Sequence, residues 1–275
     1  MIAAVNQYAT GQAALRLNGF ANTIDEVLVG TGAEHLRTDD FMSFLADAPA
    51  GNVQYGSRIE LCDWIQPLIG MKEEQVFKTV VQTLMDQGDS PLDYDTSDGS
   101  QIRSEQIDIT ASSRQWTYQV CAEFGWFQTP SKIHPLRSVL VNTEYYIENC
   151  KRVFPGLNMD NKPAAYKSII DQGGFNIAGT NTFFTNGGED PWLWATQREQ
   201  RPDLNQVART SDCNNCGHCA DLYTPKPEDP QELQDTRQMI VDWLDDILVE
   251  VRGPRPAAVN ETVVSEESAA EPFLQ

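Results

Sequence analysis

The feature that most restricts the fold is an alternation of strand-like and helix-like segments in the second half of the chain. Runs rich in aromatic and β-branched residues predict strands at Trp116–Cys121 and Thr182–Thr185. Between them, apolar residues at helical spacing predict a helix from Thr143 to Phe154. Such an alternation is typical of a mostly parallel sheet covered by helices. We therefore expect an α/β fold.

The first part of the chain has a different pattern. Residues 1–110 are expected to be mostly helical, because apolar residues recur at helical spacing through much of this stretch. Residues 87–100 are polar, acidic and rich in turn formers, which indicates a surface loop or a domain edge. We expect a boundary near residue 110, a second part over 111–252, and a disordered acidic tail over 253–275.

The last helix has the clearest boundary signals in the chain. Asp229 is placed to cap it, and Glu232 completes a capping box. Pro230 fits its first turn, and Gly253 ends it. Before this helix the sequence predicts a loop of about thirty residues, longer than a compact domain usually tolerates without a functional reason. We expect the chemistry of the chain to lie in that loop.

The charge of the chain limits its partners. The sequence has 20 basic and 40 acidic residues, which give a formal net charge of −20 at pH 7. A chain this acidic repels the phosphates that a nucleic-acid-binding protein must neutralise. It also contains no apolar run of about eighteen residues, the length that a spanning helix needs. We expect neither nucleic acid nor a membrane as a partner.

Two polar constellations stand where an α/β sheet builds its sites. Asp190 follows the apolar strand, inside Asn186–Trp192, and His218 lies inside Cys216–Leu222. In α/β-hydrolases the catalytic order along the chain is Ser, Asp, His, and these two residues fit it. Asp190 would orient the imidazole of His218, which would act as a general base towards a serine hydroxyl.

Several further blocks carry a specific resemblance. The chain resembles the family of prolyl carboxypeptidase, dipeptidyl peptidase II and thymus-specific serine protease. The blocks follow the family's order over roughly residues 40–250; they are Val53–Gly56, Leu61–Cys62, Trp116–Thr129, Tyr145–Cys150, Asn186–Trp192 and His218–Leu222.

The resemblance implies the C-terminal part of an α/β-hydrolase. Residues 1–110 would belong to an inserted helical lid, and 111–252 would complete the core with Asp190 and His218 as triad members. It further implies a serine-type exopeptidase, similar to prolyl carboxypeptidase or dipeptidyl peptidase, that acts on peptides without a cofactor. A lysosomal, vacuolar or secreted location is implied as well.

The nucleophile is the point at which the chain departs from the family. No serine stands in a G-x-S-x-G elbow, and the nearest imitation, Ser57, lies in a helical neighbourhood and is rejected. We expect the serine to lie upstream of Met1 and this chain alone to be inactive. The alternative is an inactive truncated paralogue that acts as a binding or structural module.

The six cysteines favour an oxidising compartment, although the first residues lack the features of a signal peptide. Cys213, Cys216, His218 and Cys219 could supply four zinc ligands, but a closed zinc site would occupy the histidine needed as a base. We expect a disulfide or free thiols there, and no metal. The family resemblance suggests that Cys121 and Cys150 form a bridge. Cys62 could pair with a cysteine upstream of the chain or stay free.

Five aromatic residues could line a hydrophobic substrate pocket, although aromatic residues at such spacing more often belong to a core, and a core role is expected. They are Trp116, Trp126, Phe127, Tyr145 and Tyr146. Glu123 could contact a substrate amine, but a solvated or paired carboxylate is the expectation.

Overall fold

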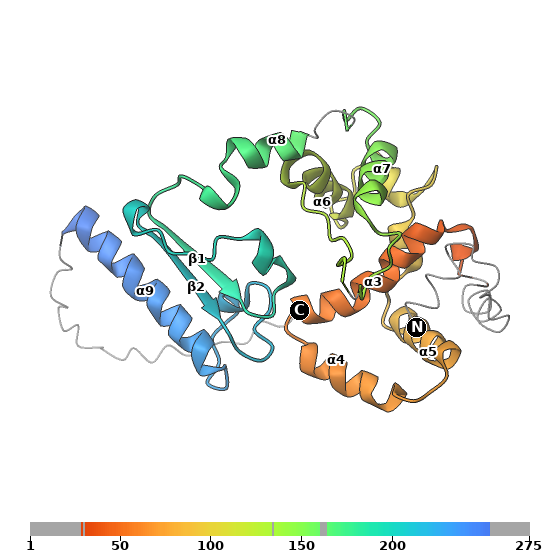
Figure 1. The fold of residues 1–275 in the computed structure, drawn as a ribbon, viewed down its shortest axis with the longest axis horizontal. Helices are drawn as coiled ribbons and strands as arrows, with labels where there is room; N and C mark the ends of the chain where they lie inside the picture. The colour runs from red at the N-terminus through yellow and green to blue at the C-terminus, as the bar shows by residue number, and fades with distance from the viewer. Residues whose placement is uncertain (1–28, 30, 134, 160–163, 254–275) are drawn as a thin grey trace, which may run out of the picture. The chain divides into compact units, whose positions relative to one another are not determined.

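A computed structural model describes residue 29 and residues 31–133, 135–159 and 164–253 (Figure 1). The chain divides into two compact units, one up to Thr236 and one from Arg237 onward. Apart from Gly253, the tail predicted at 253–275 lies outside the described residues. Among the described residues, no helix is both long enough and apolar enough to cross a membrane.

The described residues before 110 are mostly helical, as the sequence predicts, although residues 87–110 hold only two short 3-10 turns. They form α3 (Thr38–Gln54), α4 (Arg58–Ile65) and α5 (Glu73–Asp86), with a 3-10 turn at Gln66–Leu68 between α4 and α5. Apolar residues of α3 and α5 face one another because they recur every three or four positions. The resulting core is completed by residues before and within α7 (Thr143–Val153); it contains Phe41, Met42, Phe44, Leu45, Phe77, Val81, Leu84, Val141 and Tyr145.

The prediction of a strand at Trp116–Cys121 is wrong. The segment is helical, in α6 (Ser113–Gln119) and a π-helical turn (Val120–Phe124) that packs against α8 (Ala164–Asp171). Aromatic residues fit either a strand or a helix, and here Cys121 is buried while Trp116 is 46% exposed. In this segment only Cys121 is buried, and no strand among the described residues pairs with it.

The helix predicted from Thr143 to Phe154 is confirmed as α7 (Thr143–Val153). Its capping residue is Asn142, whose side-chain oxygen accepts a hydrogen bond of 3.1 Å from the backbone N–H of Tyr145. An asparagine at this position satisfies a backbone donor that the first turn of a helix leaves unpaired.

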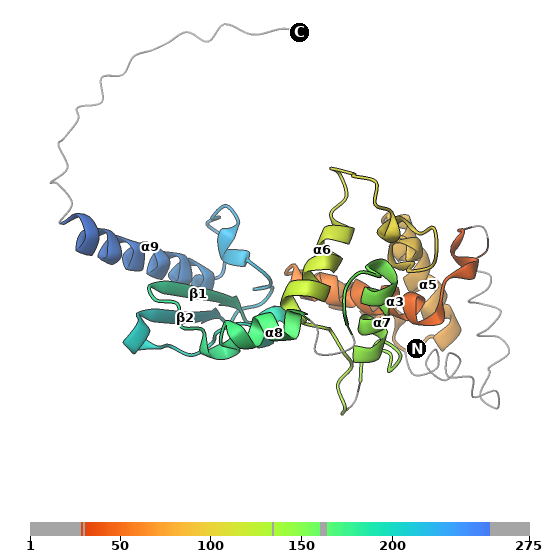
Figure 2. The same ribbon diagram turned by 90° about the horizontal axis from the view of Figure 1, so that it is seen from above.

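The sheet consists of β1 (Thr182–Gly187) and β2 (Gln206–Ser211), which are parallel and lie side by side in Figures 1 and 2. The register runs from the pair Thr182–Gln206 to the pair Gly187–Ser211. β2 lies within the segment that the sequence predicts as a long loop, so that prediction is wrong. The described residues combine helices with a parallel sheet, which agrees with the expected α/β class.

The final helix is confirmed as α9 (Gln231–Arg252), and Gly253 follows it with a φ of 81°. Its first turns are joined to β2 by polar contacts. The carboxylate of Glu232 accepts a hydrogen bond of 2.6 Å from Arg209, and Thr236 shares one of 2.8 Å with Ser211. The chain that leaves β2 therefore returns to it after the loop that carries His218.

Asp40 of α3 is fully buried and accepts hydrogen bonds from the backbone and hydroxyl of Thr96 at 3.1 and 2.9 Å. Burial nevertheless raises its pKa above that of a free aspartate. A carboxyl group with a raised pKa in the folded state stabilises the fold most below its unfolded pKa. That stability is lost as the pH rises through the folded pKa.

We therefore expect Asp40→Asn to become more stable relative to the wild type as the pH rises from about 4 to 7, by about 1.4 kcal/mol for each pKa unit of the difference. Urea unfolding at a series of pH values measures this trend. Asp98→Asn is the control, because the Asp98 side chain is 92% exposed. A free-energy difference between Asp40→Asn and the wild type that does not change with pH would contradict the prediction.

Candidate active site

Asp190 is placed by the turn that follows β1. The strand ends at Gly187, and Asp190 begins a 3-10 helix at Pro191–Ala195. One of its carboxylate oxygens, Oδ1, accepts a hydrogen bond of 2.9 Å from the backbone N–H of Trp192. Its side chain is only 10% exposed. This cap fixes the direction of the carboxylate and leaves its second oxygen for another partner.

His218 supplies that partner from the loop after β2. Its Nδ1 lies 2.8 Å from Oδ2 of Asp190. Its backbone N–H donates a hydrogen bond of 2.6 Å to the carbonyl oxygen of Gln54, at the end of α3. The structure thus brings together the two residues that the sequence singles out, 28 positions apart.

The geometry determines what this imidazole can do. A carboxylate beside Nδ1 favours the tautomer with its proton on that nitrogen, which directs the basic lone pair to Nε2. The His218 side chain is 37% exposed, so it is accessible to a reacting group. The pair has the relation that a catalytic Asp–His dyad needs.

Glycine residues allow the acid loop and the histidine loop to meet closely. A Cβ on Gly187 would collide with the carbonyl oxygens of Gly217 and Cys216, the latter at 2.5 Å. A Cβ on Gly217 would collide with the carbonyl oxygen of Gln54 and lie 2.7 Å from the backbone nitrogen of Gly56. Any larger side chain would push these segments apart and separate Asp190 from His218.

The sequence alone did not indicate that the corner between α3 and α4 belongs to this site. Besides its backbone bond to His218, Gln54 accepts a hydrogen bond of 3.3 Å from the indole of Trp192 through its side-chain oxygen. The ring of Tyr55 lies edge-on to the imidazole of His218, with centroids 6.4 Å apart. Both residues lie in the Val53–Gly56 block, so the resemblance contained the signal.

A cavity of about 750 Å³ reaches this corner, and Tyr55 and Trp192 are among the residues that line it. Its lining also includes all five aromatic residues singled out in the sequence: Trp116, Trp126, Phe127, Tyr145 and Tyr146. A core role alone is therefore wrong for Trp116 and Trp126, which are 46% and 36% exposed, while Tyr145 belongs to the core as well. Glu123 is exposed and is not part of the lining.

A comparison with known protein families gives this arrangement its context. The model of the serine carboxypeptidase S28 family matches residues 62–240, well over half of the chain. The chain belongs to the S28 family.

Curated relatives of this S28 chain include the Arabidopsis thaliana protein "Probable serine protease EDA2". It is 29% identical over 188 residues, which are 66% of this chain and 37% of that protein. The Mus musculus "Thymus-specific serine protease" is 33% identical over 145 residues, 49% of this chain and 26% of that protein. The chain thus spans about a third or less of the length of these relatives. No solved structure matches it.

A third relative of the S28 chain is the Arthroderma benhamiae "Probable extracellular serine carboxypeptidase", 34% identical over 92 residues. These residues are 32% of this chain and 12% of that protein. All three printed names describe serine-type proteases or carboxypeptidases.

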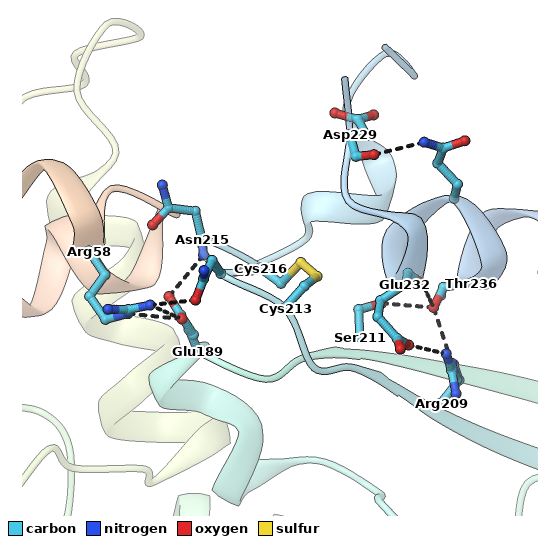
Figure 3. Close-up of a disulfide and its surroundings, with 12 residues drawn as sticks. Arg58, Glu189, Arg209, Ser211, Cys213, Asn215, Cys216, Asp229, Glu232 and Thr236 are labelled. Atoms are coloured by element: carbon cyan, nitrogen blue, oxygen red, sulfur yellow. Dashed lines mark hydrogen bonds and ion pairs between the residues drawn. A yellow bond between two sulfur atoms is a disulfide. The ribbon is translucent and has the colours of Figure 1, made fainter. Parts of the chain in front are cut away.

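Two disulfides connect parts of the S28 chain. Cys121 and Cys150 join the π-helical turn to α7, as the resemblance implied. Cys213 and Cys216 form the second bridge, just before His218 (Figure 3). This bond removes two of the four ligands that a zinc site would need. Among the described residues, no group of three or more His, Cys, Asp or Glu side chains is arranged to hold a metal ion.

The remaining two cysteines, Cys62 and Cys219, are free and exposed. Partial burial and the nearby carboxylates of Asp221 and Asp190 raise the pKa of the Cys219 thiol. A raised pKa reduces the fraction of reactive thiolate near neutral pH. Cys219 therefore does not have the features of a nucleophile.

Proposed function

We propose that this chain carries the acid–base half of a serine-type exopeptidase, with His218 as general base and acid and Asp190 as the residue that orients it. The observation that carries the proposal is the bond of 2.8 Å between Nδ1 of His218 and Asp190, in a chain of the S28 family. The nucleophile is a serine outside these 275 residues, because no serine of the chain stands in a nucleophile elbow.

The proposed mechanism is acyl transfer. Nε2 of His218 removes the proton from the serine hydroxyl as its oxygen attacks the scissile carbonyl carbon. The imidazolium, stabilised by the charged Asp190, then donates that proton to the amine of the leaving peptide. Water attacks the resulting ester in the same way, which releases the second product and restores the serine.

The cavity beside the dyad is the proposed substrate site. Trp192 follows Asp190 by two positions, and Tyr55 contacts the ring of His218, so both connect the dyad to the lining of the cavity. Its volume of about 750 Å³ suits a few residues at one end of a peptide. Residues 1–110 would form part of the lid over this site, and 111–252 part of the catalytic core.

The proposed activity is that of a prolyl carboxypeptidase or a dipeptidyl peptidase, and the proposed location is a lysosome, a vacuole or the extracellular space. Two disulfides and an extracellular relative support such a compartment.

The test uses the full-length protein, meaning this chain together with the upstream sequence that we expect to encode the serine. It is incubated with peptides that contain proline near one end, with either the amino or the carboxyl terminus blocked. An exopeptidase cleaves only the peptides whose relevant end is free, and mass spectrometry identifies that end. Cleavage within doubly blocked peptides would contradict exopeptidase action. No cleavage of any peptide would favour the alternative, an inactive paralogue that acts as a binding or structural module.

A further inference from the structure

Glu189, the residue before Asp190, holds two other segments at once. Its Oε1 accepts a hydrogen bond of 2.8 Å from Nε of Arg58 and forms an ion pair with Nη2 of the same guanidinium at 2.7 Å. Its Oε2 accepts one of 3.1 Å from the backbone N–H of Asn215 (Figure 3). The Glu189 side chain is only 18% exposed. These contacts connect the acid loop to the start of α4 and to the loop of His218.

The backbone of Glu189 adds to this connection. Its N–H donates a hydrogen bond of 3.0 Å to the carbonyl oxygen of Cys216, two residues before His218. Glu189 therefore binds the histidine loop from both its side chain and its backbone. Asp190 is the next residue, so any shift of Glu189 moves the acid relative to the imidazole.

The segment that Glu189 holds is itself constrained. Asn215 has a φ of 58°, an unusual value for a residue with a side chain, and the disulfide between Cys213 and Cys216 encloses it. Its side-chain oxygen accepts a bond of 3.2 Å from the N–H of Ile59, in the first turn of α4. The turn is thus preformed, with a backbone N–H directed at the Glu189 carboxylate.

Arg58, the partner of Glu189, also contacts the loop that leads to His218. Its guanidinium also donates a hydrogen bond of 2.9 Å to the side chain of Asn214. The hydrogen bond from Arg58 to Glu189 raises the pKa of the arginine, so the cation is firmly retained. Charge-assisted hydrogen bonds of this kind are about twice as strong as neutral ones.

We propose that Glu189, together with Arg58, is a positioning residue that sets the distance between Asp190 and His218. The expected effect on catalysis rests on the proposed function. The effect on structure does not, because it concerns only the bond between the side chains of Asp190 and His218. Glu189 does not touch the substrate in this account, and it acts through the two loops that it joins.

The first experiment measures Glu189→Ala in the full-length protein. We expect kcat to fall by about 10- to 100-fold, because small misplacements of a catalytic group have effects of this size. KM should stay within about twofold, since the variant changes alignment rather than substrate contacts. Glu189→Gln keeps one acceptor oxygen, which can serve Asn215 or Arg58 but not both, so its kcat should lie between those of Glu189→Ala and the wild type. If Glu189→Ala does not fold, Arg58→Gln is the substitute. It removes the positive charge but leaves the bond between Glu189 and Asn215, and it should also lower kcat.

The matched control is Glu232→Ala. It also removes a glutamate that pairs with an arginine, Arg209, at 2.6 Å, but this pair joins β2 to the first turn of α9. The Glu232 side chain is 50% exposed, against 18% for Glu189, so its loss should cost less stability, and it should leave kcat unchanged. An equal loss of kcat in the control would overturn the proposal, because the effect would then be general destabilisation.

A second measurement separates this proposal from the proposed function. The Nδ1 proton of His218 is followed by NMR, because a proton held in a bond to a carboxylate exchanges slowly with water. We expect its signal in the wild type and in Glu232→Ala, and its loss in Glu189→Ala. That result without any peptide cleavage would support the positioning role and reject the catalytic one. An unchanged signal in Glu189→Ala would overturn the positioning role.

Discussion

Replacing His218 with alanine in the full-length protein is expected to reduce kcat for peptide cleavage by about a million-fold, as loss of the base does in one well-studied serine protease. The reason is that no other group near Asp190 can accept the serine proton in the proposed mechanism. Stopped assays with purified protein measure the loss. Thermal unfolding should be almost unchanged, because the imidazole is partly exposed and its removal opens no cavity in a core.

Two further variants sharpen this result. Asp190→Asn can still cap Trp192 through its amide oxygen, but it cannot accept the Nδ1 proton with its nitrogen. We expect it to lower kcat by about 10⁴-fold. His35→Ala is the control, because His35 is an exposed histidine in a short turn before α3. If His218→Ala kept a tenth or more of wild-type activity, the assignment of the base would be wrong.

Removing the disulfide between Cys121 and Cys150 is expected to lower the free energy of unfolding by about 3.5 kcal/mol, from the chain entropy that a loop of this length regains. The two residues are separated by 29 positions, and each is 2% exposed. Serine at both positions avoids a free thiol but buries hydroxyls where sulfur packed, which adds to the loss. Urea unfolding of the full-length protein measures the change.

The second disulfide provides the comparison. Cys213 and Cys216 are separated by only 3 positions, so their replacement by serine should cost about 2 kcal/mol in the same model. It should, however, reduce kcat more than the first pair does, because the turn it closes leads directly to His218. Equal losses of stability from both pairs would contradict the loop-length explanation.

The helices could be predicted from the sequence where their apolar faces were regular, as in α3, α5, α7 and α9. β2 could not, because its six residues contain few apolar side chains. Gln206 is buried there because its amide donates to the carbonyl oxygens of Ile177 and Gly179, at 2.9 and 2.5 Å. Such tertiary compensation leaves no periodic signal in the strand itself.

The pairing of Asp190 with His218 could be anticipated, because both stand in motifs that follow strands and keep the order of a triad. The roles of Arg58 and Glu189 could not. They are 131 positions apart, and each alone is an ordinary charged residue in a polar stretch. Only the fold brings the corner of α3 and α4 against both loops, so the contacts that hold the dyad had to come from the structure.

The measurement that tests the central claim most directly is labelling of the full-length protein with a fluorophosphonate, which reacts with serine nucleophiles activated by a histidine. Mass spectrometry then locates the modified residue. The account predicts one labelled serine outside the 275 residues of this chain, and labelling that is lost in His218→Ala but retained in His35→Ala. A label on a serine within this chain, or labelling that persists without His218, would contradict it.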